Sequence, residues 1–227
     1  DILWFDTEQS DTEVQYFQNN IIKMAGTKDD DYIYSKYYAM KLRQYDEPQR
    51  LAIVDRIITA PDVFNNVGLI VLDGIADLIY NVNEIEASKK LVTRLTYWAD
   101  KLQVPLIVAL HTNKDGKDAT GSLGGFLNKK SSYTIKCIPE FDGGPSTVRP
   151  YFTRNGQNFQ PFMISNQGDD DEFPGMPIFY DPAEDVSDLG WINTKPRSQE
   201  VHKFDKEKGG ISLDSDANLI GNILDAL

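Results

Sequence analysis

Leu69-Ile70-Val71-Leu72-Asp73-Gly74 is a continuous apolar run that ends in a carboxylate and a glycine. Such an uninterrupted run is typical of a strand that is buried on both faces of a parallel sheet. Runs of the same kind occur at Asp1 to Asp6 and at Leu106 to His111. The sequence therefore predicts three buried strands, and a polar side chain stands at the end of each.

Amphipathic helices are predicted between these strands. Ser10-Asp11-Thr12-Glu13 is a capping box that begins one helix, and Pro48 begins another. Apolar residues return at helical spacing between Ile85 and Leu102, and Tyr37 to Leu42 has the composition of a further strand. This alternation predicts a doubly wound, mainly parallel α/β sheet that is flanked by helices.

The pattern changes beyond Ser131, where antiparallel strands and turns are predicted. The strands span Tyr133 to Ile138, Val148 to Thr153 and Phe159 to Ser165, and Asn155-Gly156 predicts a hairpin before the last of them. After Ser165 the chain is rich in Pro, Asp and Gly. We expect a core over residues 1–165 and a linker or tail over 166–227, with a possible terminal helix.

Composition narrows the class of protein. A chain of 227 residues, 41% of them hydrophobic, can bury one sizeable core with an appendage. The single cysteine excludes an internal disulfide framework, and no signal peptide or membrane-spanning run is evident, which favours a cytoplasmic protein with no membrane partner. The net charge of −12 disfavours a general electrostatic grip on nucleic acid, so that any such contact must be local.

Polar side chains stand where the predicted strands end: Asp6-Thr7-Glu8, Asp73 and His111. The carboxyl ends of parallel strands lie along one edge of a sheet, where ligands bind. Because neighbouring strands are about 4.8 Å apart, these side chains can converge on one small ligand. Asp73 stands where many nucleotide enzymes place the carboxylate that holds a Mg²⁺-bound water.

Four short motifs resemble, in order and spacing, those of RecA-fold ATPases. They are Trp4-Phe5-Asp6-Thr7-Glu8-Gln9-Ser10, Leu69 to Gly74, Leu106 to Lys114, and Thr153-Arg154-Asn155-Gly156. Over residues 1–165 the sequence is most similar to the plasmid RepA and replicative hexameric helicase branch, which includes ATPases of bacterial mobile elements.

This resemblance implies a role for each strand-end residue. Glu8 would be the catalytic carboxylate that polarises the attacking water, and Asp73 would be the Walker B aspartate that serves Mg²⁺. His111 would sense the γ-phosphate, so that Glu8, Asp73 and His111 together contact ATP. Arg154 would be the arginine finger offered to the neighbouring subunit's nucleotide. The resemblance also implies a homo-oligomeric ring, a hexamer, that moves on single-stranded DNA.

Each of these residues also has a structural interpretation, which stays open. Asp73 can cap a helix or form a turn, and Glu8 can neutralise a helix N-terminus. His111 can be an ordinary edge histidine, and Arg154 a solvated hairpin residue. The four residues together favour the ATPase interpretation, because a scaffold has no physical need for all of them. A catalytically silent RecA-like assembly or regulatory module remains the alternative.

Two departures from the family pattern bear on activity. The phosphate loop Gly-x-x-x-x-Gly-Lys-Ser/Thr is absent, and in the family it lies just before the strand with which this chain begins. We therefore expect the chain not to hold ATP tightly, and an N-terminal piece in the parent protein to supply the loop. We also expect the missing strand to be central, so that Leu3 to Phe5 and the strand around Ile70 lack backbone partners. The second departure is Phe152, where such helicases often carry a lysine.

The segment Asn113 to Gly125 follows the strand of His111 and contains Lys114, Lys117 and four glycines. RecA-like proteins place a mobile DNA-facing loop there, and the glycines would permit its rearrangement. A flexible surface turn is an equally good interpretation.

Overall fold

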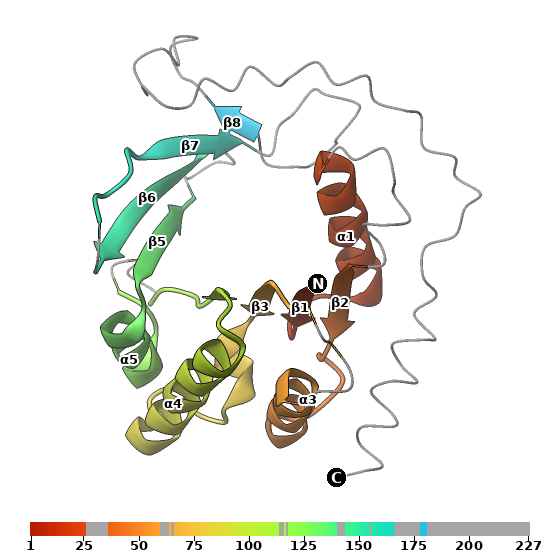
Figure 1. The fold of residues 1–227 in the computed structure, drawn as a ribbon. Coiled ribbons are helices and arrows are strands. Elements are labelled where there is room, and N and C mark those ends of the chain that lie inside the picture. Colours follow the sequence, from red (N-terminus) through yellow and green to blue (C-terminus); the bar gives the residue numbers. More distant parts are fainter. Residues whose placement is uncertain are drawn as a thin grey trace, which may run out of the picture. The chain divides into compact units, whose positions relative to one another are not determined.

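The computed structural model describes residues 1–25, 36–59, 64, 66–113, 116, 118–139, 144–154, 156–165 and 178–180 (Figure 1). Their backbone divides into two compact units, and the boundary between Leu127 and Asn128 falls within helix α5 (Gly121–Lys130). Each unit has its own four-stranded sheet. Within these residues, no helix has the length and apolar character that crossing a membrane requires.

The first unit is built on a parallel sheet. Its strands are β1 (Ile2–Asp6), β2 (Tyr37–Lys41), β3 (Leu69–Asp73) and β4 (Leu106–Val108), in the order β2-β1-β3-β4. The register places Asp6 opposite both Lys41 and Asp73. The carboxyl ends of the two central strands therefore meet at one edge of the sheet.

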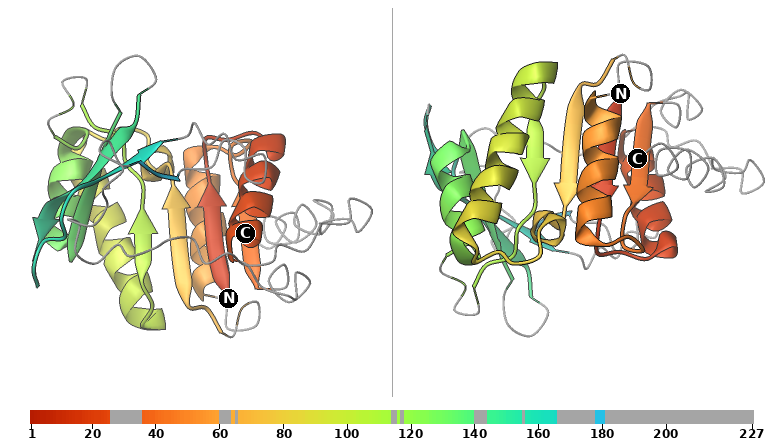
Figure 2. Two further views of the ribbon diagram at one scale, coloured as in Figure 1. Left: turned by 90° about the horizontal axis from the view of Figure 1, so that it is seen from above. Right: turned by 90° about the horizontal axis from the view of Figure 1, so that it is seen from below.

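Helices cover both faces of this sheet. Helix α1 (Asp11–Ala25) packs on one face, while α3 (Glu47–Thr59) and α4 (Ile85–Leu102) pack on the other (Figure 2). A short 3-10 helix, η1 (Ile75–Leu78), follows β3. The predicted capping box begins α1, since Ser10 N donates to Glu13 Oε2 at 2.8 Å and Glu13 N donates to Ser10 Oγ at 3.4 Å. The doubly wound α/β prediction is confirmed.

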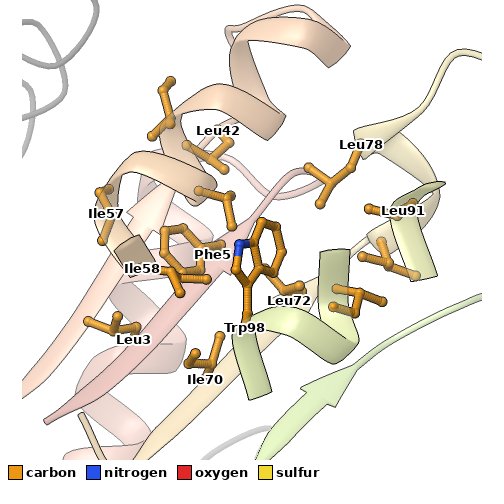
Figure 3. Packing of buried hydrophobic residues seen from close by; sticks show 14 of the residues in the cluster. Leu3, Phe5, Leu42, Ile57, Ile58, Ile70, Leu72, Leu78, Leu91 and Trp98 are labelled. Atoms are coloured by element: carbon orange, nitrogen blue, oxygen red, sulfur yellow. The ribbon is translucent and has the colours of Figure 1, made fainter. Parts of the chain in front are cut away.

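The main core lies between the sheet and helices α3 and α4. Leu3, Phe5, Ile70 and Leu72 point from β1 and β3 toward the fully buried indole of Trp98 on α4 (Figure 3). These strand positions are two apart, as expected for side chains that share one face of a sheet. The apolar runs seen in the sequence thus supply the sheet side of the core.

The indole of Trp98 also makes a hydrogen bond, so substitutions of Trp98 and of its partner can separate packing from the polar contact. Its Nε1 donates to Asp55 Oδ1 at 2.8 Å, and Arg94 Nη2 lies 2.9 Å from Asp55 Oδ2. Trp98→Phe leaves a void and an unmatched acceptor, so we expect it to lower the free energy of unfolding by about 2–3 kcal/mol in urea titrations. Asp55→Asn retains an acceptor oxygen for the indole and should lose less than about 1 kcal/mol. Equal losses in the two variants would show that indole packing contributes little.

The second unit is an antiparallel sheet. Its strands β5 (Tyr133–Ile138), β6 (Ser146–Thr153), β7 (Phe162–Ser165) and β8 (Ile178–Tyr180) pair in sequence order. The predicted C-terminal antiparallel strands are confirmed, and β8 is an addition from the region interpreted as linker.

The hairpin predicted around Asn155-Gly156 agrees with the antiparallel pairing of β6 with β7, the strands on either side of it. Asn155 itself lies outside the described residues. Only Ser146 to Val148 of β6 pair with β7, and the partner of Val148 is Phe162. The distal half of β6 instead pairs with β5, and the Arg154 N–H continues toward that side by donating to Ser132 O at 2.9 Å. The connection between Val148 and Phe162, the last paired residues of β6 and β7, is therefore longer than a two-residue turn.

The expectation of unpaired central strands is also wrong. β1 pairs with β2 and β3, and β3 pairs with β1 and β4, so both have neighbours on each side. β4 has one strand neighbour among the described residues, and its Ile107 is 54% exposed. The predicted strand Leu106 to His111 accordingly ends at Val108 and is only partly buried.

Candidate active site

The buried carboxylate of Asp6 shapes the chain that carries Glu8. Asp6 Oδ1 accepts the backbone N–H groups of Glu8 at 2.9 Å and Gln9 at 2.7 Å, which turns the chain sharply at the end of β1. The Asp6 carbonyl accepts the Leu42 N–H at 2.7 Å. Glu8 is thereby held at the carboxyl edge of the sheet. The sequence groups Asp6 with Glu8 but does not by itself reveal this role. The signal that could have revealed it is an aspartate two residues before the residue whose N–H it accepts.

Hydrogen bonds from Thr7 and the close packing of Gly74 join the end of β1 to the end of β3. Thr7 Oγ1 donates to the carbonyls of Asp73 and Gly74, both at 3.1 Å, and Thr7 N also donates to Asp73 O. Gly74 has φ of 84°, and a Cβ there would lie 2.1 Å from Thr7 Oγ1 and 3.0 Å from Glu8 Cγ. Glycine at position 74 therefore permits the close approach of Thr7 and Glu8 to the end of β3. The sequence placed Thr7 in the strand-end group and Gly74 in a motif, but it did not reveal the contact between them.

His111 reaches the same place from the end of β4. Its Nε2 lies 3.2 Å from Glu8 Oε1 and 3.4 Å from Glu8 Oε2. The His111 carbonyl accepts both the hydroxyl of Thr120, at 2.7 Å, and its N–H, at 3.1 Å. The imidazole is 81% exposed and Glu8 is 35% exposed, so a ligand can reach both. The structure thus brings His111 to Glu8, which lies 103 positions earlier in the chain.

These side chains line a pocket of about 120 Å³. Its walls are Glu8, Asp73, Gly74, Ala76, Ala109, Leu110 and His111. Pockets that hold drug-sized ligands typically measure about 300–1,000 Å³. This pocket therefore offers space for a phosphate-sized group with water, but not for a whole nucleotide.

Comparisons with known proteins bear on the fold. No protein-family model matches the chain, and no curated protein is significantly similar. Among solved structures, the crystal structure of the RadB recombinase matches with a TM-score of 0.50 at 14% sequence identity, covering 76% of each chain. The chain has a RecA-like α/β fold. At this identity the likeness concerns the fold alone, so the chemistry of the site rests on its own geometry.

Negative charge is concentrated at the centre of this RecA-like sheet edge. Burial raises the pKa of Asp73, the charges of Asp6 and Glu8 raise it further, and His111 lowers it. Ionised Asp73 thus lies in a setting that opposes its charge, and a cation would relieve that opposition. An oxygen donor of this kind fits Mg²⁺, which commonly binds one or two carboxylates and keeps several waters. Within the described ranges, no three acidic, histidine or cysteine side chains form a cage that could hold a metal by itself.

The raised pKa of Asp73 predicts a stability effect. Above its folded-state pKa, the ionised group destabilises the fold, so Asp73→Asn should increase the free energy of unfolding at neutral pH by about 1 kcal/mol. The gain should shrink as the pH falls through that pKa, and should vanish once the carboxyl is protonated in both states. Thermal unfolding across pH measures it. Asp77→Asn is the control, since Asp77 lies 3.7 Å from Arg50 and should gain nothing. A destabilised Asp73→Asn would contradict the prediction.

Arg154 belongs to the second unit and is not among the residues that line the pocket. Its Nε donates to Ser131 O at 3.4 Å, and its Nη2 donates to Lys129 O. These contacts hold carbonyls at the C-terminal end of α5, an arrangement that suits a cation. Arg154 therefore stabilises the end of α5 through these hydrogen bonds, besides its predicted role as an arginine finger.

The segment after His111 differs from the loop expected at Asn113 to Gly125. An isolated antiparallel bridge joins Thr112 to Ala119, and the chain enters α5 at Gly121, where Leu123 is fully buried. Thr120, at the end of this segment, donates its hydroxyl to His111 O and so ties the segment back to the histidine. Lys114 and Lys117, the proposed phosphate contacts, lie outside the described residues.

Proposed function

We propose that this chain is the core of an ATP-hydrolysing, DNA-translocating protein of the helicase type. The supporting observation is the convergence of Glu8, Asp73 and His111 from the ends of three separate parallel strands in a RecA-like sheet. A purely structural sheet edge gains nothing from holding Glu8 beside Asp73, because each carboxylate opposes ionisation of the other.

Three tasks in phosphoryl transfer to water suit these side chains: holding Mg²⁺, activating the water, and stabilising charge on the phosphoryl oxygens. Asp73 would hold Mg²⁺ through a bound water, and Glu8, Asp73 and His111 together would face the terminal phosphate of ATP. Bound Mg-ATP supplies the electrophilic phosphoryl group. Glu8 orients a water in the pocket and accepts its proton. His111 is placed to direct a ring N–H toward charge that develops on phosphoryl oxygens. The same ring nitrogen, Nε2, lies 3.2 Å from Glu8 Oε1 in the structure.

We further propose that the grip on the β- and γ-phosphates comes from a phosphate loop outside these 227 residues. The absence of that motif from the sequence and the small volume of the pocket both support this. The proposed assembly is a homo-oligomeric ring, hexameric as in replicative helicases of plasmids and mobile elements, with single-stranded DNA as its track.

Nucleotide binding tests whether the affinity for phosphates depends on a loop outside these residues. Isothermal titration calorimetry on residues 1–227 should show no saturable binding of Mg-ATP at micromolar concentrations, because most of the phosphate affinity resides in the loop. Adding the loop segment should restore binding. Tight binding by residues 1–227 alone would refute the proposed dependence on an external loop.

The second candidate is a catalytically silent RecA-like assembly or regulatory module, which the missing phosphate-loop motif favours. Turnover discriminates the two. The complete protein should hydrolyse ATP, and single-stranded DNA should accelerate the reaction. A complete protein that contains the loop, binds ATP and yet does not hydrolyse it would establish the silent module.

A further inference from the structure

The guanidinium of Arg50, on helix α3, lies where the chain after β2 meets the chain after β3. Its Nε donates to Leu42 O at 3.1 Å and its Nη2 donates to Arg43 O at 3.0 Å, both just after β2. Its Nη1 donates to Asp77 O at 3.1 Å and lies 3.7 Å from Asp77 Oδ2, in the short helix η1 that follows β3. Only 14% of the Arg50 side chain is exposed. One largely buried cation therefore joins two segments of the first unit.

Strand β1, which leads to Glu8, lies between the two strands whose ends Arg50 joins. On the side of β2, Leu42 N donates to Asp6 O at 2.7 Å. The carboxylate of the same aspartate accepts the N–H groups of Glu8 and Gln9. A short chain of hydrogen bonds therefore runs from Arg50 through Leu42 and Asp6 to the backbone of Glu8.

A second chain of hydrogen bonds reaches the same place from the side of β3. Asp77 N donates to Gly74 O at 3.0 Å, and this carbonyl also accepts the hydroxyl of Thr7 at 3.1 Å. Thr7 directly precedes Glu8 in the chain. The segment that carries the proposed base is therefore held from both sides, and Arg50 is common to the two chains.

A purely local task explains only part of this arrangement. Leu42 and Arg43 lie eight and seven residues before Arg50, so these two bonds hold the turn between β2 and α3. The bond to Asp77 spans 27 residues and links segments on opposite sides of β1 in the strand order. Arginine suits this span because its planar guanidinium carries five donors in a fixed fork, whereas lysine offers one compact ammonium. The third bond thus adds a link that the turn does not require.

We propose that Arg50 is a positioning residue that holds Glu8 where the attacking water must be activated. This inference rests on the proposed function, and it adds a residue that is not among those lining the pocket. A misplacement of about 1 Å can cost about 10²-fold in rate, even when the altered residue is remote from the chemistry. Because Arg50 acts through the backbone near Glu8, its loss should slow the chemical step and leave nucleotide affinity nearly unchanged.

Amide hydrogen exchange of the 227-residue chain, followed by NMR, tests the positioning without nucleotide. Arg50→Gln should speed exchange at the Glu8 and Gln9 amides about 10-fold more than at the Ile70 amide, because the carboxylate that accepts them is held less firmly. Ile70, in the central strand β3, reports opening of the whole sheet. Arg56→Gln is the matched control, since it makes the same change at an exposed position in the last turn of α3 and should alter none of these amides.

Turnover by the complete protein tests the link to Glu8. Arg50→Gln should lower kcat for ATP hydrolysis about 10- to 100-fold. In a Glu8→Gln background, the same substitution should lower kcat less than about 2-fold, because a residue that acts through Glu8 then has no base to position. Arg50→Lys keeps the charge without the fork, so it should give the same pattern with smaller effects. Arg56→Gln should leave kcat unchanged.

Four outcomes would overturn the proposal. They are exchange at Glu8 and Gln9 that changes only as Ile70 does, equal losses of kcat in the two backgrounds, a loss of nucleotide affinity in place of kcat, and equal effects of Arg56→Gln. Circular dichroism shows whether Arg50→Gln folds, and Arg50→Lys carries both tests if it does not. If the complete wild-type protein does not hydrolyse ATP, the proposed function fails, while hydrogen exchange still decides whether Arg50 positions Glu8.

Discussion

Glu8→Gln should lower kcat for ATP hydrolysis by the complete protein roughly 10²-fold or more, while nucleotide affinity stays nearly unchanged. Glutamine keeps the shape of the side chain but cannot accept a proton from water. The Glu8 carboxylate lies within 3.2 Å of His111 and lines the pocket beside Asp73, where the proposed chemistry needs a base. Steady-state turnover together with equilibrium nucleotide binding separates the two effects.

Glu13→Gln is the matched control for Glu8. It makes the same chemical change five residues later, in the capping box of α1, where the hydrogen bond with Ser10 lowers the pKa of Glu13. We expect it to weaken the capping box of α1 and to leave kcat unchanged. If turnover survives Glu8→Gln, Glu8 is a charge that stabilises the helix terminus and not the catalyst.

Arg154→Ala should remove most hydrolysis by the assembled protein, by about 10³- to 10⁵-fold if the guanidinium acts as a finger. The arginine also holds the carbonyls of Lys129 and Ser131, so the single variant mixes a local structural effect with a catalytic one. Thermal unfolding of the variant measures the structural part. Loss of turnover with a nearly unchanged unfolding temperature is the result expected for a finger.

Subunit mixing tests the finger more sharply than the single variant. Protomers with Arg154→Ala keep Glu8, and protomers with Glu8→Gln keep the finger, so mixed rings should contain some interfaces that have both. Activity should recover in part, and the recovery should depend on protein concentration, as assembly does. Mixtures no more active than either variant, in rings shown to have exchanged subunits, would leave Arg154 with its contacts at the end of α5.

Local pattern predicted the elements of the first unit well. The run from Leu69 to Asp73 is β3 to the residue, and the helix expected between Ile85 and Leu102 is α4. Both depend on periodic burial, which a sequence displays directly. The strand-end rule also placed Glu8, Asp73 and His111 at one edge, because it needs parallel strands and no knowledge of their order.

The order of the strands and the long-range contacts could not be predicted from the sequence. The sequence does not state which strands are neighbours, and the expected gap beside β1 was wrong because β2 and β3 occupy both of its edges. The second role of Arg154 depends on where α5 ends, and the contact of Thr7 with Gly74 joins residues 67 positions apart. Pairing of β6 with β5 as well as β7 could likewise not be inferred from the local signal at Asn155-Gly156.

The parallel sheet also implies an order of events during folding. Ile2 pairs with Tyr37 and Leu69, and Ile70 pairs with Leu106, so no pairing in this sheet joins nearby stretches of chain. Such pairings close slowly, whereas β5 and β6 are neighbours in sequence and can pair early. Glu8 and Asp73 are joined when β1 meets β3, but His111 arrives only with β4. During synthesis, the pocket is therefore completed only after the chain has been made beyond residue 111. A nascent chain that ends between residues 73 and 111 has the two carboxylates without the histidine.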